Sequence, residues 1–260
     1  MWTYLWQNFL VDAKVRGYIA DKILSLYHEC GCEALIEIGP GKWAITKLIQ
    51  DISDNFFMID MDPTFRDNWI LVIEHWEFIL SDVLQLDVEK FLKEKKLHSE
   101  KTLVAGNLPY YITSPILRKF FSAWQNYAGG VFMVQDEVGQ KIKTDAKKKS
   151  YLRWLLNFFY EVKYLKWVPA KCFKPAPKVK SCLIQLTTKS EPAWSAGRQL
   201  TINRDKFVDF LDLFAPFSRK TLWAIQTMIN KKSVCIFVIP EALKKKRLEE
   251  CTWGDIAQII

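Results

Sequence analysis

The sequence predicts an α/β protein in which a mostly parallel, doubly wound sheet of about seven strands carries helices on both faces. Three observations predict this class. Short apolar runs typical of buried strands alternate with stretches of helical periodicity along most of the chain. The first such run ends in the turn Gly39-Pro40-Gly41, which is typical of a nucleotide-binding βα connection. Hydrophobic residues form 50% of the 260 residues, which is enough for a sizeable core.

The expected elements follow this alternation in order. Strands are expected at 33–38, 55–60, 76–80, 101–106, 129–135, 160–168 and 179–187, and helices at 17–29, 43–52 and 87–97. A further helix is expected to begin at Ser114 as its N-cap, with Pro115 at the first helical position. The last two strands alternate polar and apolar residues, so we expect them to form an antiparallel edge of the sheet.

The chain is expected to contain two domains. After about Thr188 the composition changes to that of a linker, with Ser190, Pro192, Ser195 and Gly197. Residues 204–260 then look helical, because apolar residues recur at helical spacing at Phe207, Phe210, Leu211 and Phe214. We therefore expect one domain over 1–188 and a small helical domain over 189–260.

The positive charge of the chain is concentrated in one segment. The net charge is +8, and 141–189 holds thirteen Lys or Arg residues against two acids, so the remainder of the chain is slightly acidic. Rings interleave with these cations at Tyr151, Trp154, Tyr164, Trp167 and Phe173. Lysines that meet phosphates beside rings that stack on bases are typical of a nucleic-acid surface. The sequence is also compatible with an alternative, in which this segment is a solvated lysine-rich face that binds no nucleic acid. Lys147, Lys148 and Lys149 would be part of that face.

Other features narrow the class of protein. No apolar run reaches the length of about 18 residues that a membrane span needs, and the first ten residues do not resemble a signal peptide. The six cysteines are scattered along the chain, which is typical of reduced thiols in a cytoplasm. Cys30 and Cys32 have no second pair of ligands nearby in the sequence, so no metal site is expected.

The first turn and two acids indicate a cofactor that contains adenosine. Gly39 to Ala44 form a G-x-G-x-x-A turn, which allows the backbone to approach a ligand closely. Asp60 ends the second strand, 21 residues after Gly39, where a carboxylate can accept hydrogen bonds from ribose hydroxyls. Asp82 follows the third strand, where it can reach an adenine amine or cap a helix. These residues do not separate a nicotinamide dinucleotide from S-adenosylmethionine.

The fourth strand runs into Asn107-Leu108-Pro109-Tyr110, a signature of methyltransferases that modify planar nitrogen. The lone pair of an exocyclic amine is delocalised into the ring, which makes it a poor nucleophile. Two acceptors, the Asn107 side-chain oxygen and the Leu108 carbonyl, can bind the amine hydrogens and draw the nitrogen towards tetrahedral geometry. Pro109 stiffens the turn, and Tyr110 offers a face to a flipped base. The motif therefore favours S-adenosylmethionine as the cofactor.

The chain resembles the ribosomal RNA adenine N6-dimethyltransferases nearly from end to end. The matching motifs are Gln7-Asn8-Phe9-Leu10, Glu37-Ile38-Gly39-Pro40-Gly41, Ile59-Asp60-Met61-Asp62, Asp82, Asn107 to Pro115, Met133 to Val138, Phe173 to Ser181, Phe217 to Leu222 and Arg247 to Cys251. The motif that begins at Phe217 favours the enzymes of small-subunit RNA over the macrolide-resistance methyltransferases.

The resemblance implies a Rossmann-like methyltransferase that dimethylates N6 of two adjacent adenines near the 3′ end of small-subunit ribosomal RNA. Its expected partner is this RNA within an assembling subunit, and the expected enzyme is a cytoplasmic monomer. S-adenosylmethionine is expected to contact Asn8, Leu10, Gly39, Gly41, Asp60, Asp82 and Asn107. The expected catalytic group is Asn107, Leu108, Pro109 and Tyr110, with Phe173 as a second aromatic residue that stacks on the target base.

Five positions depart from the family pattern, among them Trp6, which replaces a small residue before the motif at Gln7. Asp60 stands where glutamate is usual, and Trp43 replaces a small residue, where it could crowd the methionine end of the cofactor. Tyr111 replaces a common asparagine, and Asp136 replaces a basic residue. Three alternatives are therefore kept: a macrolide-resistance type of enzyme for large-subunit RNA, a non-catalytic nucleic-acid-binding relative, and a dinucleotide-dependent oxidoreductase. The intact motif at Asn107 favours an active methyltransferase.

Overall fold

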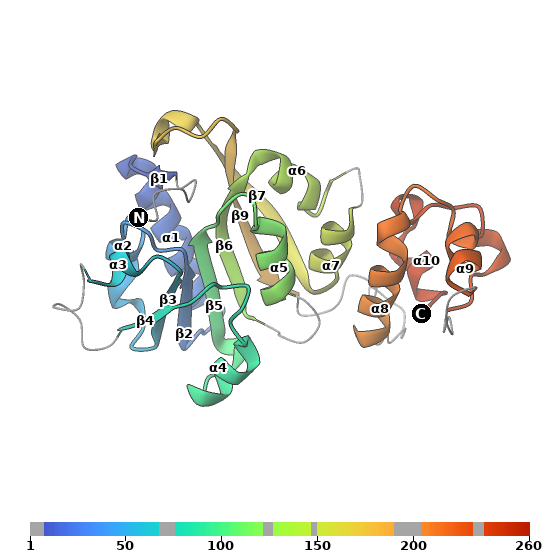
Figure 1. Ribbon diagram of the computed structural model, residues 1–260, viewed down its shortest axis with the longest axis horizontal. Helices are drawn as coiled ribbons and strands as arrows, with labels where there is room; N and C mark the ends of the chain where they lie inside the picture. Colours follow the sequence, from blue (N-terminus) through green and yellow to red (C-terminus); the bar gives the residue numbers. More distant parts are fainter. Residues whose placement is uncertain (1–7, 68–75, 122–126, 147–149, 190–203, 231–236) are drawn as a thin grey trace.

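The computed structural model describes residues 8–67, 76–121, 127–146, 150–189, 204–230 and 237–260 (Figure 1). Its strands are β1 (Phe9–Leu10), β2 (Ala34–Ile38), β3 (Phe56–Asp60), β4 (Trp76–Leu80), β5 (Thr102–Asn107), β6 (Gly129–Gln135), β7 (Tyr160–Val168), β8 (Phe173–Lys174) and β9 (Ser181–Thr188). Its α-helices are α1 (Ala13–Glu29), α2 (Thr46–Ile49), α3 (Pro63–Asp67), α4 (Val88–Glu94), α5 (Thr113–Phe121), α6 (Asp136–Ile142), α7 (Tyr151–Phe159), α8 (Arg204–Phe214), α9 (Leu222–Asn230) and α10 (Trp253–Ala257). None of these helices has the length and apolar character that crossing a bilayer requires.

Seven strands form one twisted sheet in the order β4-β3-β2-β5-β6-β9-β7. The first five run parallel, whereas β9 and β7 form the antiparallel edge. Strands β1 and β8 pair separately, at the end of the sheet where the parallel strands finish (Figure 1). The predicted α/β class, the strand count and the antiparallel edge are therefore confirmed.

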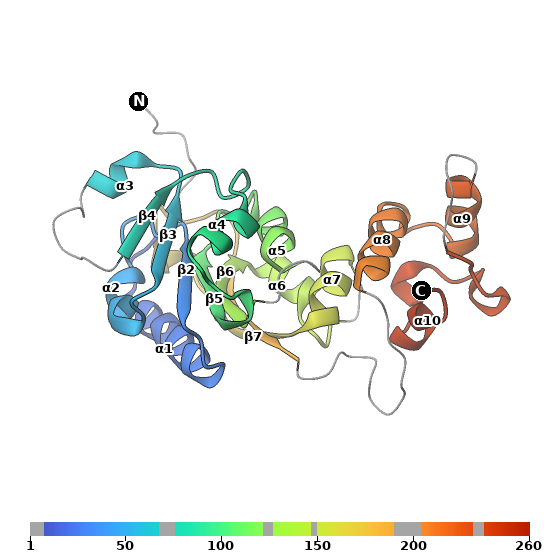
Figure 2. The ribbon, with the colours of Figure 1, turned by 90° about the horizontal axis from the view of Figure 1, so that it is seen from below.

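Helices cover both faces of the sheet because alternate residues of its strands belong to two different cores. On one face, α1 packs against Leu35 of β2 and Leu103 of β5. On the other face, α4, α5 and α7 pack against Ile36 and Val104, the next residue of each strand (Figure 2). Strands buried on both faces read as continuous apolar runs, which is why they could be recognised in the sequence.

Strands β5 and β2 approach each other closely just before the carboxyl end of β5. A Cβ atom on Gly106 would lie 2.3 Å from the carbonyl oxygen of Ile38. Only glycine fits this contact, because real Cβ atoms do not approach a backbone oxygen so closely. The contact fixes the position of Asn107, the next residue, above the sheet.

Helix α5 begins two residues before the predicted first helical position, Pro115. Thr113 is its first residue, and the Thr113 hydroxyl donates a hydrogen bond of 3.1 Å to the carbonyl oxygen of Pro109. The prediction of Ser114 as N-cap is therefore wrong. Pro115 still lies in the first turn, where its missing N–H has no helical partner to lose.

The rings of the basic segment do not form one open stacking surface. Trp154 is 1% exposed in α7 and packs edge-on against Trp253 of the C-terminal helices, with ring centroids 4.5 Å apart. Phe173 is also buried. Tyr164 and Tyr151 donate their hydroxyls to carboxylates on Asp136 and Asp212, which leaves Trp167 as the exposed ring. The expectation of five rings available to bases is wrong, because Trp154 and Phe173 are buried in the two cores. Lys147, Lys148 and Lys149 lie outside the described residues.

Helices α8, α9 and α10 form a lobe beside α7 (Figure 1). Phe207 of α8 stacks on Phe158 of α7, with ring centroids 4.1 Å apart. The apolar residues noted at helical spacing, from Phe207 to Phe214, are buried. We keep the division into 1–188 and 189–260 as a proposal, since β9 ends at Thr188 and the linker residues Ser190, Pro192, Ser195 and Gly197 lie outside the described residues.

Candidate active site

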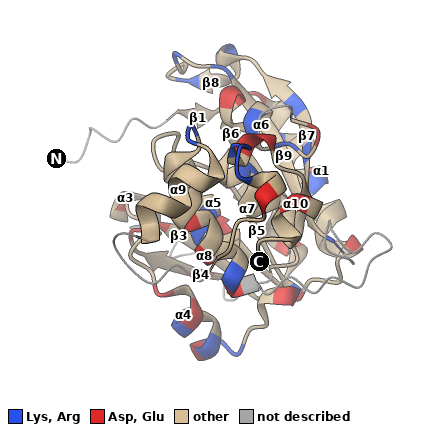
Figure 3. Ribbon diagram, turned by 90° about the vertical axis from the view of Figure 1, so that its right-hand side faces the viewer, with Lys and Arg blue, Asp and Glu red and all other residues tan. Residues whose placement is uncertain are grey.

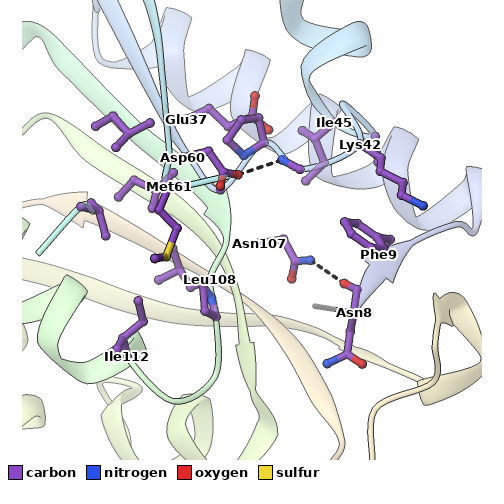
Figure 4. A pocket seen from close by; sticks show the side chains of 18 of the residues that line it. Asn8, Phe9, Glu37, Lys42, Ile45, Asp60, Met61, Asn107, Leu108 and Ile112 are labelled. Atoms are coloured by element: carbon purple, nitrogen blue, oxygen red, sulfur yellow. Dashed lines mark hydrogen bonds between the residues drawn. The ribbon is translucent and has the colours of Figure 1, made fainter. Parts of the chain in front are cut away.

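A pocket opens at the carboxyl ends of β2, β3 and β5, where parallel sheets bind their ligands (Figure 4). It encloses about 1050 Å³ of empty space, part of which is open to solvent. The residues expected to contact the cofactor all line it: Asn8, Leu10, Gly39, Gly41, Asp60, Asp82 and Asn107. The structure therefore brings this expected set together in one place.

The glycine turn after β2 has the backbone conformation that glycine favours. Gly39 and Gly41 have φ angles of 67° and 53°, in the left-handed region. A Cβ atom on Gly41 would also lie 3.3 Å from the ring of Phe9. The two glycines thus leave room for the backbone and the Phe9 ring at the wall of the pocket.

Trp43 does not crowd the pocket. Its φ of 61° turns the chain so that the side chain, 4% exposed, packs beside Phe78 of β4. The pocket is lined instead by its neighbours Lys42 and Ala44. The concern that Trp43 would crowd the methionine end of the cofactor is therefore not supported.

Asp60 stands at the end of β3 with its carboxylate held by the turn. Its Oδ2 accepts a hydrogen bond of 3.4 Å from the Gly41 amide (Figure 4). Its Oδ1 accepts one of 3.0 Å from the Asp62 amide. Burial raises the pKa of this carboxyl, and the backbone amides lower it in part. A buried carboxylate in this position suits hydroxyl donors from a ligand.

Asp82 lies on the next side of the pocket, after β4. Its Oδ1 accepts a hydrogen bond of 2.9 Å from the Leu84 amide, so it shapes the turn that follows the strand. It also lines the pocket. Both interpretations of Asp82 from the sequence, as a turn residue and as a ligand contact, are compatible with this position.

Asn107 and Leu108 present acceptors to the pocket. The Asn107 Nδ2 donates a hydrogen bond of 3.1 Å to the carbonyl oxygen of Asn8, which fixes the amide plane (Figure 4). Its Oδ1 and the Leu108 carbonyl accept no hydrogen bond from the described part of the chain. The Leu108 amide donates to Met133 at 3.1 Å, and its side chain is buried. Two rigid acceptors are thus left for a ligand.

Tyr110 is held by a residue that sequence reasoning did not single out for a role. Its hydroxyl lies 2.6 Å from the Ser181 Oγ, at the start of β9. Burial raises the pKa of Tyr110, so the phenol stays protonated at neutral pH. Ser181 was visible only as the last residue of the motif that begins at Phe173.

Phe173 is the expected site residue that the structure does not bring to the pocket. Its side chain is 4% exposed and packs in the core under α1, and it does not line the pocket. Its backbone pairs with Leu10, across the short β1–β8 sheet. Its role as a second stacking ring stays a prediction.

Glu37 is a buried acid of the pocket that sequence reasoning assigned no role. It is 1% exposed within β2, and its Oε2 accepts a hydrogen bond of 2.7 Å from the Thr46 hydroxyl. Burial raises its pKa to about 7, with a further contribution from Asp60. The sequence signal that could have identified Glu37 is a charged residue inside the apolar run 33–38.

The charges of the pocket suit a cationic ligand that contains adenosine. Glu37, Asp60 and Asp82 are acidic, and Lys42 supplies the one ammonium group among the described lining residues. This lining opposes the pyrophosphate of a dinucleotide. It suits S-adenosylmethionine, whose sulfonium and ammonium groups are positive, with Met61 and Ile112 as apolar walls. Within the described ranges, no group of three or more His, Cys, Asp or Glu side chains is arranged to hold a metal ion.

Fold and site together define an S-adenosylmethionine-dependent methyltransferase. The sequence model of the family "Ribosomal RNA adenine dimethylase" matches residues 3–202 of the chain. Because this match covers most of the sequence, the chain belongs to the ribosomal RNA adenine dimethylase family.

Individual relatives agree with this assignment. The chain is 33% identical to the ribosomal RNA small subunit methyltransferase A of Mesoplasma florum over 223 residues, which cover 83% of this chain and 79% of the relative. It is 29% identical to the protein of that name from Bacillus pumilus over 232 residues, which cover 87% and 75%.

Two solved structures share the fold. The dimethyladenosine transferase of Plasmodium falciparum has a TM-score of 0.63 at 21% identity, over 90% of this chain and 92% of that one. The 23S rRNA methyltransferase ErmE has a TM-score of 0.61 at 21% identity, over 85% and 84%. The Rossmann-like methyltransferase fold is therefore confirmed.

Proposed function

We propose that this protein dimethylates N6 of two adjacent adenines near the 3′ end of small-subunit ribosomal RNA, with S-adenosylmethionine as methyl donor. Family membership and the names of the relatives support ribosomal RNA as substrate and the small subunit as its source. The observation that carries the chemistry is the pair of unpaired acceptors at Asn107 and Leu108.

These acceptors act on the amine before the methyl group arrives. The Asn107 Oδ1 and the Leu108 carbonyl accept the two amine hydrogens, which orients the nitrogen lone pair towards the pocket. Because both are fixed by other bonds, little reorganisation is needed during the reaction. Asp60, Asp82, Gly39 and Asn8 would hold S-adenosylmethionine, which would supply an electrophilic methyl group.

Tyr110 positions the base. Its ring is held by Ser181 beside the acceptors, where it provides a face for an adenine removed from its stack. We further propose that the enzyme acts as a monomer in the cytoplasm, on RNA within an assembling subunit. These last points rest on the family relationship.

A large-subunit target is the second candidate, because the fold of ErmE is about as similar as that of the Plasmodium falciparum enzyme. Primer extension on both ribosomal RNAs, after incubation with enzyme and S-adenosylmethionine, separates the two. A stop confined to small-subunit RNA supports the proposal. A stop confined to large-subunit RNA contradicts it.

The catalytic assignment is tested with Asn107→Ala. The variant should lose about 10²- to 10³-fold in rate, the usual cost of one preorganised polar contact in a transition state. RNA affinity should stay nearly unchanged, because it depends on many phosphate contacts. The measurement is single-turnover methylation at saturating RNA and cofactor. Asn55→Ala, at the opposite end of the sheet, is the matched control. A rate within about threefold of wild type would mean that the site is wrongly assigned.

A further inference from the structure

Two ammonium groups lie over one aromatic ring on the side of the molecule formed by α1 and β7. The Lys22 Nζ is 5.6 Å from the centroid of the Tyr18 ring, and the Lys166 Nζ is 4.8 Å from it. Lys22 lies one turn after Tyr18 on α1, whereas Lys166 comes from near the end of β7. Cations favour the face of a ring, so Tyr18 holds two like charges close together.

Lys14 extends this group along the helix. Lys14, Tyr18 and Lys22 follow at intervals of four residues, so they lie on the same face of α1. We call Lys14, Tyr18, Lys22 and Lys166 the basic stripe. It covers about 12 Å of helix at about 1.5 Å per residue, a length that several phosphates of one strand would span. Figure 3 shows Lys and Arg on α1 and on β7.

Among the residues that the structure describes, the lysines of the basic stripe have no partner of opposite charge within ion-pair distance. None of the three forms an ion pair with a carboxylate in the described part of the chain. By contrast, Lys163 at the other end of β7 pairs with Glu161 at 3.2 Å. The nearby Asp12 accepts from the Val15 amide as the N-cap of α1. The charge of the stripe is therefore available to an anion.

The basic stripe leads away from the pocket. Lys14 lies in the first turn of α1, directly after β1, whose Phe9 and Leu10 line the pocket. At the pocket rim, the Lys42 Nζ lies 4.5 Å from the centroid of the Phe9 ring (Figure 4). A strand bound in the pocket through one base would meet these cations in sequence as it leaves.

We propose that the basic stripe binds the phosphate backbone of the ribosomal RNA strand that flanks the target adenines. The inference rests on the proposed function, and it names a surface that lies mostly outside the basic segment 141–189. An unneutralised row of ammonium groups is complementary to a polyanion, and binding releases the counterions of the RNA. Its contribution is to RNA affinity and to the direction in which the strand enters.

The test is the double variant Lys22→Gln with Lys166→Gln. Its binding to a labelled RNA of the 3′-terminal region of small-subunit RNA is measured between low and physiological salt. The slope of log K against log salt should become shallower by up to about 0.7 for each phosphate that is no longer neutralised on single-stranded RNA, or about 1.4 in total. KM for RNA should rise, and kcat at saturating RNA should stay within about twofold.

Lys90→Gln with Lys93→Gln is the matched control. These lysines are also exposed, on α4 at the opposite end of the sheet, and their replacement changes the net charge equally. A slope that is unchanged in the test variant, or equally reduced in the control, overturns the proposal. A defect seen with small-subunit particles but absent with naked RNA also overturns it, because the stripe would then face a ribosomal protein. Failure of the wild-type protein to methylate RNA would contradict the proposed function. The salt dependence of RNA binding tests the basic stripe independently of that result.

Discussion

At the residue scale, Glu37 places an ionisable group where solvent cannot reach it. The folded chain holds its carboxyl with a pKa raised from 4.5 to about 7, because burial disfavours the charged form. Between these pH values the folded chain keeps a proton that the unfolded chain has lost. The contribution of Glu37 to the free energy of unfolding is therefore full below about pH 4.5 and is lost as the pH rises towards 7.

This linkage predicts the behaviour of Glu37→Gln. Glutamine keeps an oxygen for the Thr46 hydroxyl but cannot ionise, so its advantage over wild type should grow with pH, by at most about 1.4 kcal/mol per pH unit. Urea unfolding of both proteins from about pH 5 to about pH 8, without cofactor, measures the difference. Parallel profiles over that range would show that folding does not raise the pKa of Glu37.

The sequence identified residues whose roles depend on local pattern. Gly39, Asp60 and Asn107 sit at strand ends, where the alternation of strands and helices fixes their location. The sequence could not show whether the Trp43 side chain enters the pocket. Its direction depends on a left-handed φ and on contact with Phe78 of another strand. The bond between Tyr110 and Ser181 joins residues 71 apart in the chain, and no local pattern encodes such a pairing.

At the element scale, this bond connects the loop before α5 to the first residue of β9. Each variant, Tyr110→Phe and Ser181→Ala, removes one partner and should release the ring. We expect the two to be non-additive in the rate of single-turnover methylation, with a coupling of about 0.5–1.5 kcal/mol, the usual net value of one hydrogen bond. A double-mutant cycle measures this coupling. Fully additive effects would mean that the hydroxyl pair does not position the ring.

Strands were easier to predict than helices in this chain. Strands β2, β3, β5 and β6 are buried on both faces and therefore stand out as apolar runs, whereas the edge strand β4 is only partly buried. Helices α6 and α7 were not among the expected elements. Tertiary packing determines the structure of this region, because Trp154 and its neighbours in α7 are buried under the C-terminal lobe.

At the scale of the whole molecule, the C-terminal lobe is attached in two ways. Phe207 stacks on Phe158 in the core, and Asp212 accepts two hydrogen bonds from Arg118, of 2.9 and 3.0 Å, near the surface. Both charged side chains are about half exposed, so solvent screens this pair. Burial of the rings should therefore contribute most of the attachment.

Two variants separate these contributions. Phe207→Ala should destabilise the protein by about 3–5 kcal/mol and raise hydrogen exchange in α8 and α7. Asp212→Ala, which also removes the acceptor of the Tyr151 hydroxyl, should cost no more than about 2 kcal/mol. Chemical unfolding with hydrogen exchange provides both readouts. A greater destabilisation by Asp212→Ala than by Phe207→Ala would assign the attachment to the ion pair instead.

The acidic lining of the pocket also affects what happens between successive methyl transfers. Asp60 and Asp82 outnumber Lys42, so the pocket attracts a cation even where Glu37 is protonated. The donor is a sulfonium, whereas the spent product is a thioether that no longer carries this charge. Two methyl groups on one adenine require two donors, and the product must leave before the second donor enters. We therefore expect the carboxylates to retain the donor more strongly than the product, which favours exchange of the spent molecule for a fresh one.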